Sequence, residues 1–132
     1  MFGCNFFAIA VLVLAISLQQ ALAIKCWNCA SNEKEFCNDP FDPSSLTEAD
    51  KNTFYVDCPL GQFNSTDTSS EQRAVCKKMK KMVDDKYIVT RSCDWESVNS
   101  VKNECLNQTS PLVTTFFCET CIIDGCNGES MN

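Results

Sequence analysis

The chain has 132 residues, of which 45% are hydrophobic, and its 11 basic and 17 acidic residues leave a net charge of −6 at pH 7. This acidic balance argues against nucleic acid as a partner, because phosphate backbones are bound by basic surfaces. Histidine is absent, which excludes Ser-His-Asp and Cys-His catalysis and removes the usual general base near neutral pH.

The N-terminus predicts a secretory signal peptide over residues 1–23. Residues 6–18 are almost wholly apolar, and Ala-Leu-Ala at 21–23 provides the small residues of a cleavage site. A membrane anchor is the alternative, but the apolar run is shorter than the roughly 20 residues that cross a bilayer. We therefore expect an exported domain over residues 24–127, with a short C-terminal tail over 128–132.

Ten cysteines remain after Cys4 leaves with the signal peptide. An even count in an exported chain predicts that all are paired, although the count alone leaves several hundred pairings open. Two C-x-x-C pairs would suggest zinc or redox chemistry in a reducing compartment. Export and the missing histidines favour structural disulfides, so we expect no catalytic residue, metal, cofactor or small-molecule substrate. The ten residues are Cys26, Cys29, Cys37, Cys58, Cys76, Cys93, Cys105, Cys118, Cys121 and Cys126.

The first half of the domain predicts short elements. Residues 26–37 are interpreted as a hairpin closed at its base, in which Cys29 and Cys37 are close enough to bridge. Residues 45–52 could form one or two helical turns, with Ser45 as the N-cap and Glu48 at the third helical position. A brief strand at residues 54–56 ends at Cys58, and the polar residues 59–72 form an exposed loop.

The clearest local signal is a β-hairpin over residues 74–93. Two runs, 74–83 and 87–93, flank the predicted turn Asp84-Asp85-Lys86. A helix over residues 75–83 is the alternative, since Lys and Met favour helix. The β-branched return run and the bounding cysteines favour the hairpin.

The C-terminal segment predicts one more strand and a tight loop. Residues 113–117 are β-branched and aromatic, which favours a strand. Asp124-Gly125 is a turn signal that would let Cys121 and Cys126 close a small loop. Two sequons, at Asn64 and Asn107, are predicted glycosylation sites in an exported chain.

Basic residues concentrate in the predicted hairpin. Six of the 11 lie within 14 residues, and they either form a solvated strand face or contact an acidic receptor surface or anionic head groups. They are Arg73, Lys77, Lys78, Lys80, Lys81 and Lys86.

The cysteine order resembles a known family. A C-x-x-C opens the mature chain, and its end carries a C-x4-C-N over residues 121–127. This pattern is similar to the three-finger, urokinase-receptor-like (Ly-6) superfamily over the whole mature domain. Asp-Pro-Phe-Asp at 39–42 and Thr-Arg-Ser-Cys at 90–93 resemble its invertebrate branch, which includes Sleepless (Quiver), Boudin and Crooked.

The resemblance implies a small, disulfide-rich, all-β three-finger fold with five disulfides. Its first finger would be enlarged by the polar residues 38–57 and 59–75, its central finger would be the hairpin 74–93, and its third finger would span 94–118. The implied pairs are Cys26–Cys76, Cys29–Cys37, Cys58–Cys93, Cys105–Cys118 and Cys121–Cys126.

The resemblance also implies a function without chemistry. Similar proteins bind and modulate membrane proteins such as potassium channels or nicotinic acetylcholine receptors, which affects sleep and cholinergic transmission. The alternatives are a factor for septate junction assembly and membrane protein trafficking, and a freely secreted receptor ligand. The partner-binding residues would lie near the tip of the central finger, at Lys80, Lys81, Asp84, Asp85, Lys86 and Tyr87.

Family members usually carry an apolar C-terminal tail that is exchanged for a glycolipid anchor. This sequence ends without such a tail. Either the protein is secreted free, or the sequence stops just after the residues that would accept an anchor, Asn127 and Gly128. The expected location is extracellular, on the outer face of the plasma membrane if an anchor is added.

Overall fold

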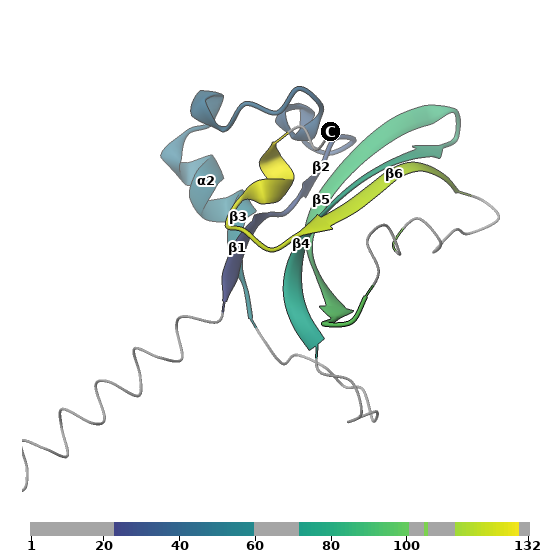
Figure 1. Cartoon of the computed structure of the whole chain (residues 1–132). Coiled ribbons are helices and arrows are strands. Elements are labelled where there is room, and N and C mark those ends of the chain that lie inside the picture. The colour runs from purple at the N-terminus through teal and green to yellow at the C-terminus, as the bar shows by residue number, and fades with distance from the viewer. Residues whose placement is uncertain (1–22, 60–71, 101–104, 106–112, 130–132) are drawn as a thin grey trace, which may run out of the picture.

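The computed structural model describes residues 23–59, 72–100, 105 and 113–129, and strands dominate these residues (Figure 1). The strands are β1 (Ile24–Trp27), β2 (Cys29–Ala30), β3 (Tyr55–Cys58), β4 (Gln72–Val83), β5 (Lys86–Ser97) and β6 (Thr114–Cys121). The helices are α2 (Glu48–Phe54) and the 3-10 turns η2 (Glu35–Cys37), η3 (Pro43–Ser45) and η5 (Cys126–Gly128).

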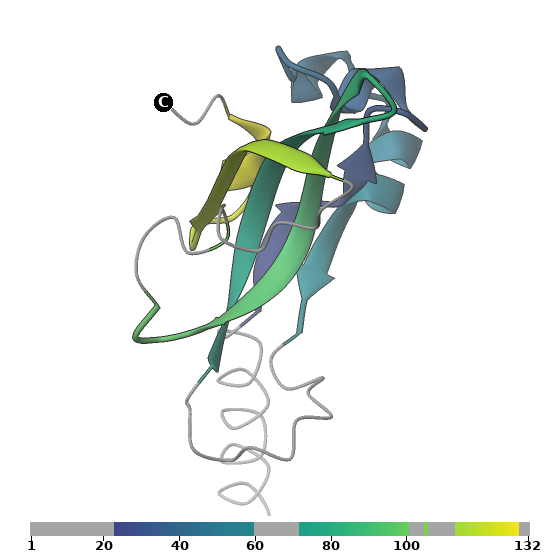
Figure 2. The same ribbon diagram turned by 90° about the vertical axis from the view of Figure 1, so that its right-hand side faces the viewer.

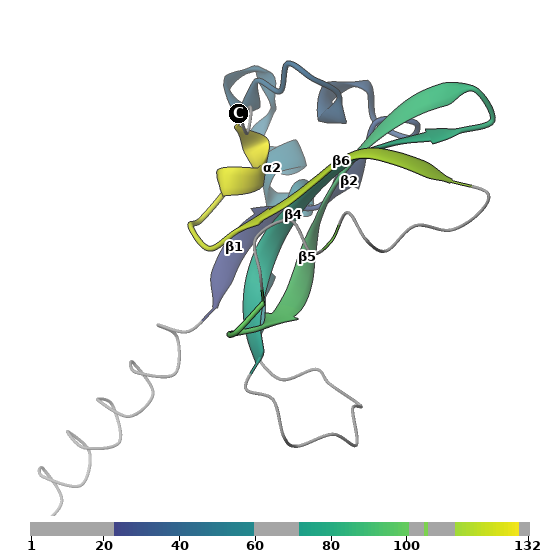
Figure 3. The same ribbon diagram turned by 45° about the vertical axis from the view of Figure 1, so that its right-hand side comes forward.

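The strands form two antiparallel sheets. β1 pairs with β3, and the larger sheet has the order β2-β5-β4-β6. Figure 1 shows the long β4–β5 hairpin curving away from the β1–β3 pair, Figure 2 shows the hairpin in front of this pair, and Figure 3 shows β6 alongside β4. The predicted fold class is confirmed: the chain is a small all-β protein with five disulfides, consistent with a three-finger fold.

The predicted central hairpin is confirmed, and the helical alternative for residues 75–83 is wrong. β4 and β5 pair along their whole length, from Gln72↔Ser97 to Val83↔Lys86. The turn has two residues rather than the predicted three, because Lys86 already belongs to β5. Asp84 and Asp85 both have positive φ (49° and 60°), as a two-residue turn that follows the strand twist requires.

The predicted strand at 113–117 is also present and extends, as β6, to Cys121. β6 pairs with β4, with Cys76 opposite Cys121, so β4 is the central strand of this end of the sheet. The predicted third finger, 94–118, therefore begins as part of β5 and ends as part of β6. Most of its middle lies outside the described residues, as do residues 60–71 of the predicted loop.

Residues 26–37 do not form the predicted hairpin. β1 pairs with β3, with Trp27 opposite Tyr55, whereas β2 pairs with β5, with Cys29 opposite Arg91. In this pairing Cys26 and Trp27 are both buried, which favours β3 over a local hairpin as the partner of β1. The chain between β1 and β3 forms the first finger, and the Cys29–Cys37 disulfide closes a loop within it.

The predicted helix is shifted by a few residues. Its N-cap is Thr47, whose Oγ1 accepts a hydrogen bond from the Asp50 backbone N–H at 3.1 Å, while an Asp50 carboxylate oxygen accepts one from the Thr47 N–H at 3.2 Å. This reciprocal pair is a capping box. Ser45 belongs instead to η3, where Asp42 is the cap. Phe54, predicted to begin a strand, is the last helical residue.

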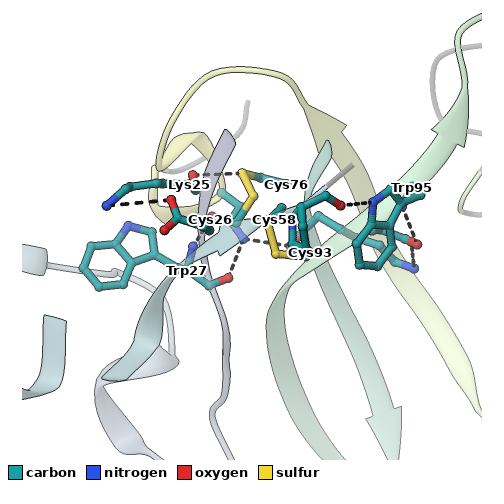
Figure 4. The surroundings of a disulfide bond; sticks show 12 residues. Lys25, Cys26, Trp27, Cys58, Cys76, Cys93 and Trp95 are labelled. Atoms are coloured by element: carbon teal, nitrogen blue, oxygen red, sulfur yellow. Dashed lines mark hydrogen bonds and ion pairs between the residues drawn. A yellow bond between two sulfur atoms is a disulfide. The ribbon is translucent and has the colours of Figure 1, made fainter. Parts of the chain in front are cut away.

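Two disulfides form the centre of the molecule (Figure 4). Cys26, Cys58 and Cys76 are fully buried and pack with Ala74, while Trp95 and Ile24 lie against this cluster. The sulfur atoms of Cys26, Cys58 and Cys93 lie within 4.8 Å of one another. These sulfurs belong to two bridges, Cys26–Cys76 and Cys58–Cys93, so the cluster is a pair of packed disulfides and offers no thiolate to a metal.

The five disulfides of the structure join the pairs that the family resemblance implies. Neither C-x-x-C pair is bonded within itself, because each of its cysteines bonds a different partner. Within the part of the chain that the structure describes, no helix has the length and hydropathy needed to cross a membrane.

Candidate functional site

The Asp-Pro-Phe-Asp segment attaches the first finger to the central finger. Asp39 Oδ1 accepts hydrogen bonds from Arg91 Nη2 at 2.6 Å and from Lys78 Nζ at 2.9 Å. Arg91 is fully buried and also donates to the backbone oxygens of Cys37 and Asn38, at 3.2 Å each. These bonds tie residues 37–39 to β4 and β5.

Phe41 adds aromatic contacts to this attachment. The centroid of its ring lies 4.6 Å from the guanidinium carbon of Arg91, and the ring packs edge-on against Trp27, with centroids 5.0 Å apart. A guanidinium over an aromatic face is stabilised by the ring quadrupole, most strongly where water is excluded. The motif that resembles the invertebrate branch therefore has a packing role.

Electrostatics at Asp39 follow from these contacts. Burial by itself raises the pKa of Asp39, but hydrogen bonds from Lys78 and Arg91, together with their charges, outweigh it and hold this pKa below its usual range. Burial lowers the pKa of Arg91, and the hydrogen bond and charge of Asp39 oppose that change. The guanidinium stays charged, because arginine is not deprotonated in proteins.

Asn127, the last residue of the C-x4-C-N pattern, joins three elements. Its Oδ1 accepts from the Trp27 N–H at 3.0 Å, and its Nδ2 donates to the backbone oxygens of Trp27 and Lys77 at 2.9 and 3.1 Å. Arg91 donates to its backbone oxygen. Asn127 and Gly128, the predicted anchor residues, are both buried in the core.

The predicted basic cluster separates into two groups. The residues near the base are paired: Arg73 with Glu96 at 2.7 Å, Lys77 with Asp94 at 2.6 Å, and Lys78 with Asp39. Toward the tip, Lys80, Lys81 and Lys86 form no ion pair within the described residues. The unpaired lysines of this cluster therefore lie at the distal end of the finger, beside the two exposed acidic residues of its turn, Asp84 and Asp85.

The six predicted binding residues do not share one face. Lys80 is opposite Val89 and Met82 is opposite Tyr87, so Lys80 and Tyr87 lie on the same side of the hairpin. Lys81 and Lys86 point to the other side, where Lys81 is half-buried. Asp84 and Asp85 form the exposed turn between them.

An exposed aromatic pair marks the Lys80 side. Tyr87 is 59% exposed and Phe116 49% exposed, and their rings meet edge-on with centroids 5.3 Å apart. Lys80 Nζ lies 5.0 Å from the centroid of Tyr87. We call Lys80, Tyr87 and Phe116 the distal patch. Tyr and Phe are enriched in the cores of protein interfaces whereas Lys is depleted there, so the two exposed rings are the stronger sign of a contact surface.

Phe116 is the residue that sequence reasoning missed. The pattern placed it in a strand but not beside Tyr87, which is 29 positions earlier in the sequence. It reaches the patch because β6 pairs with β4 and shifts register between Lys80 and Lys81. No signal within a short window of sequence predicts this pairing. Both predicted glycosylation sites, Asn64 and Asn107, lie outside the described residues.

The fold and its disulfides define the class of the protein as a disulfide-bonded three-finger domain. A family model described as the Quiver family u-PAR/Ly-6-like domain matches residues 24–127, and the chain belongs to this family. It is similar to the UPAR/Ly6 domain-containing protein crok of Drosophila melanogaster, with 28% identity over 125 residues that cover 92% of this chain and 78% of the relative. No solved structure matches significantly.

Family membership supports coarse statements about activity and location. Members are generally non-enzymatic, they are extracellular or membrane-anchored, and they commonly interact with membrane proteins.

Proposed function

We propose that this protein is a non-enzymatic extracellular module that binds an acidic surface of a membrane protein through the distal end of its central finger. The observation that carries this proposal is the distal patch, in which two exposed aromatic rings lie beside a lysine without an ion-pair partner among the described residues. Such rings contribute apolar contact area, while unpaired lysines favour association with negative charge.

The partner we favour is a receptor or ion channel. The β4–β5 hairpin is 12 residues long on each side and presents its tip away from the disulfide core (Figure 1). A narrow finger of this kind can reach into a recess of a larger protein, whereas the rest of the fold stays outside. Potassium channels and nicotinic acetylcholine receptors are the first partners to test, with regulation of sleep and synaptic transmission as the process.

A second candidate process is septate junction assembly and membrane protein trafficking. The similarity to crok over most of both chains favours this candidate. The binding surface would be the same, but the protein would bind its partner at a different place in the cell. Under this function the protein acts on its partner during transport to the cell surface, so loss of the protein would leave the partner inside the cell.

Binding can be tested on cells that express a chosen potassium channel or nicotinic receptor, with the tagged mature protein as the probe. We expect Lys80→Glu, Tyr87→Ala and Phe116→Ala each to weaken binding by about tenfold or more, as central interface residues do. Lys34→Glu and Ile123→Ala are matched controls, since both residues are exposed and lie outside the central finger. Equal binding by the patch variants and the controls would remove the distal patch from the interface.

Attachment to the membrane is a separate proposal. We expect export after cleavage at Ala23, glycans at Asn64 and Asn107, and a glycolipid anchor when the transcript encodes an apolar tail. Treatment of expressing cells with a glycolipid-cleaving phospholipase would release an anchored form. A freely secreted form would be found in the medium without treatment.

A further inference from the structure

The buried Asn127 is followed by glycine, and the fold demands both residues. The three side-chain hydrogen bonds of Asn127 use its oxygen as an acceptor and its nitrogen as a double donor. At position 128, an added Cβ would lie 2.7 Å from Nε1 and 2.8 Å from Cδ1 of Trp27. A larger residue would therefore displace the Trp27 ring, so the packing favours an Asn-Gly pair.

Asn-Gly is also the dipeptide in which asparagine loses its amide most readily when the chain is flexible. The backbone nitrogen of the glycine attacks the asparagine Cγ and loses its proton, and ammonia leaves as a five-membered succinimide forms. Water then opens this ring to aspartate or isoaspartate. Glycine favours the reaction because it has no side chain to hinder the approach and no restriction on φ.

The native structure blocks each requirement of this reaction. Hydrogen bonds to β1 and β4 hold the Asn127 amide group, so its Cγ cannot turn toward the chain. The attacking nitrogen, that of Gly128, donates to the backbone oxygen of Gly125 at 2.9 Å. Both residues are buried within η5, next to the Cys121–Cys126 disulfide. Attack therefore requires prior opening of this region.

The product of the reaction cannot take the place of asparagine. An aspartate at 127 would direct an oxygen, in place of Nδ2, at the backbone oxygens of Trp27 and Lys77. It would also bury a negative charge without a donor on that side, which is costly. Isoaspartate would lengthen the backbone between a disulfide and the glycine packed on Trp27. Arg91 cannot compensate the negative charge of an aspartate at 127, because it already donates to Asp39 and to three backbone oxygens.

We propose that Asn127–Gly128 is a deamidation site that reacts in the unfolded chain and is protected in the folded protein. A chain that forms its disulfides promptly loses the Asn127 amide only through local opening, and therefore much more slowly. A chain that remains reduced converts Asn127 to aspartate or isoaspartate and thereby loses the ability to reach the native state. The pair acts as an irreversible timer that removes slow-folding molecules from the pool able to fold.

The test compares the oxidised mature protein with the same protein held reduced by a thiol in one mildly alkaline buffer. Fragmentation mass spectrometry follows the amide-to-acid change at Asn127, and the exposed Asn28 and Asn32 serve as internal comparators. We expect deamidation of Asn127 to be slower in the oxidised protein by about a hundredfold or more, because it requires local opening. Equal rates in the two forms would overturn the proposal.

The second arm follows refolding. Chains aged in the reduced state are reoxidised, and the native fraction is separated from misfolded species. We expect the native fraction to contain intact Asn127 and the misfolded fraction to contain the deamidated residue. Directly made Asn127→Asp should likewise fail to form the native disulfides, whereas Asn32→Asp, at an exposed turn, should fold. Recovery of deamidated chains in the native fraction in proportion to their input would contradict the timer.

Discussion

One carboxylate pairs with two buried cations in this domain. Asp39 contacts both Arg91 and Lys78, which come from neighbouring strands and are almost completely inaccessible to water. The motif containing Asp39 suggested a family, but the motif alone did not show which residues it contacts. In the structure its first acidic residue pairs with Arg91 and Lys78, its phenylalanine covers the guanidinium, and Asp42 caps the following 3-10 turn.

Removing the charge of Asp39 should destabilise the whole domain. Loss of one partner from a fully buried pair costs about 3–5 kcal/mol, and partial solvent access to Asp39 lowers our expectation for Asp39→Asn to about 2 kcal/mol. Denaturant unfolding with the disulfides intact measures the change. Asp57→Asn is the control, because Asp57 is exposed and lies 3.8 Å from an exposed Lys25. Equal effects of the two substitutions would contradict the role of Asp39.

The same residue predicts a response to acid. The pKa of Asp39 is lowered in the folded state, so its contribution to stability is fully present above the unfolded pKa of about 4 and is lost as pH falls through the lower folded value. The stability difference between the wild type and Asp39→Asn should therefore shrink below about pH 4. Urea unfolding midpoints measured across the acid range test this. A constant difference down to the lowest pH would show that the charge of Asp39 is not responsible.

At the scale of elements, local sequence patterns predicted the central hairpin correctly and placed the start of the helix wrongly. The β4–β5 hairpin was predictable because alternation, β-branched residues and a short polar turn all occur within one window of sequence. The start of α2 was misplaced, since Ser45 and Thr47 are both acceptable N-caps. Asp50 decides between them, because its carboxylate reaches back to the Thr47 backbone. Ser45 lies in η3 instead, where its hydroxyl donates a hydrogen bond to the backbone oxygen of Asp42.

The helix start can be tested with two substitutions. Thr47→Ala removes the capping box and should cost about 1 kcal/mol of unfolding free energy. Ser45→Ala should cost clearly less, since Ser45 caps no α-helix and is exposed. Thermal and denaturant unfolding of the two variants provide the comparison. A larger effect at Ser45 would place the N-cap where the sequence pattern first suggested.

At the scale of the whole molecule, disulfides take the place of a large apolar core. Fully buried cysteines from β1, β3 and β4 form its centre, and the surrounding apolar residues are few. The bridge Cys26–Cys76 joins the first and central fingers across 50 residues, whereas Cys29–Cys37 closes a loop within the first finger across eight. The two bridges should therefore contribute unequally to stability.

Paired replacement by alanine measures this difference. Loop-closure entropy predicts a loss of about 4 kcal/mol without Cys26–Cys76 and about 2.5 kcal/mol without Cys29–Cys37. The first replacement also leaves a cavity in the centre, which adds to its cost. We expect the Cys26/Cys76 variant to be unfolded or nearly so at 37 °C and the Cys29/Cys37 variant to remain folded. The reverse order of stability would contradict the central position of the first bridge.

The sequence by itself determined the class of fold, the central hairpin and the C-terminal strand, because these depend on cysteine order and on short-range patterns of side chains. Only the tertiary structure decided the partner of β1, the burial of Asn127 and the meeting of Tyr87 with Phe116. Each of these joins residues far apart in the chain, and a long-range pairing is selected by the burial it achieves rather than by local propensity. The ten cysteines are visible in the sequence, but what their bridges enclose is decided by packing.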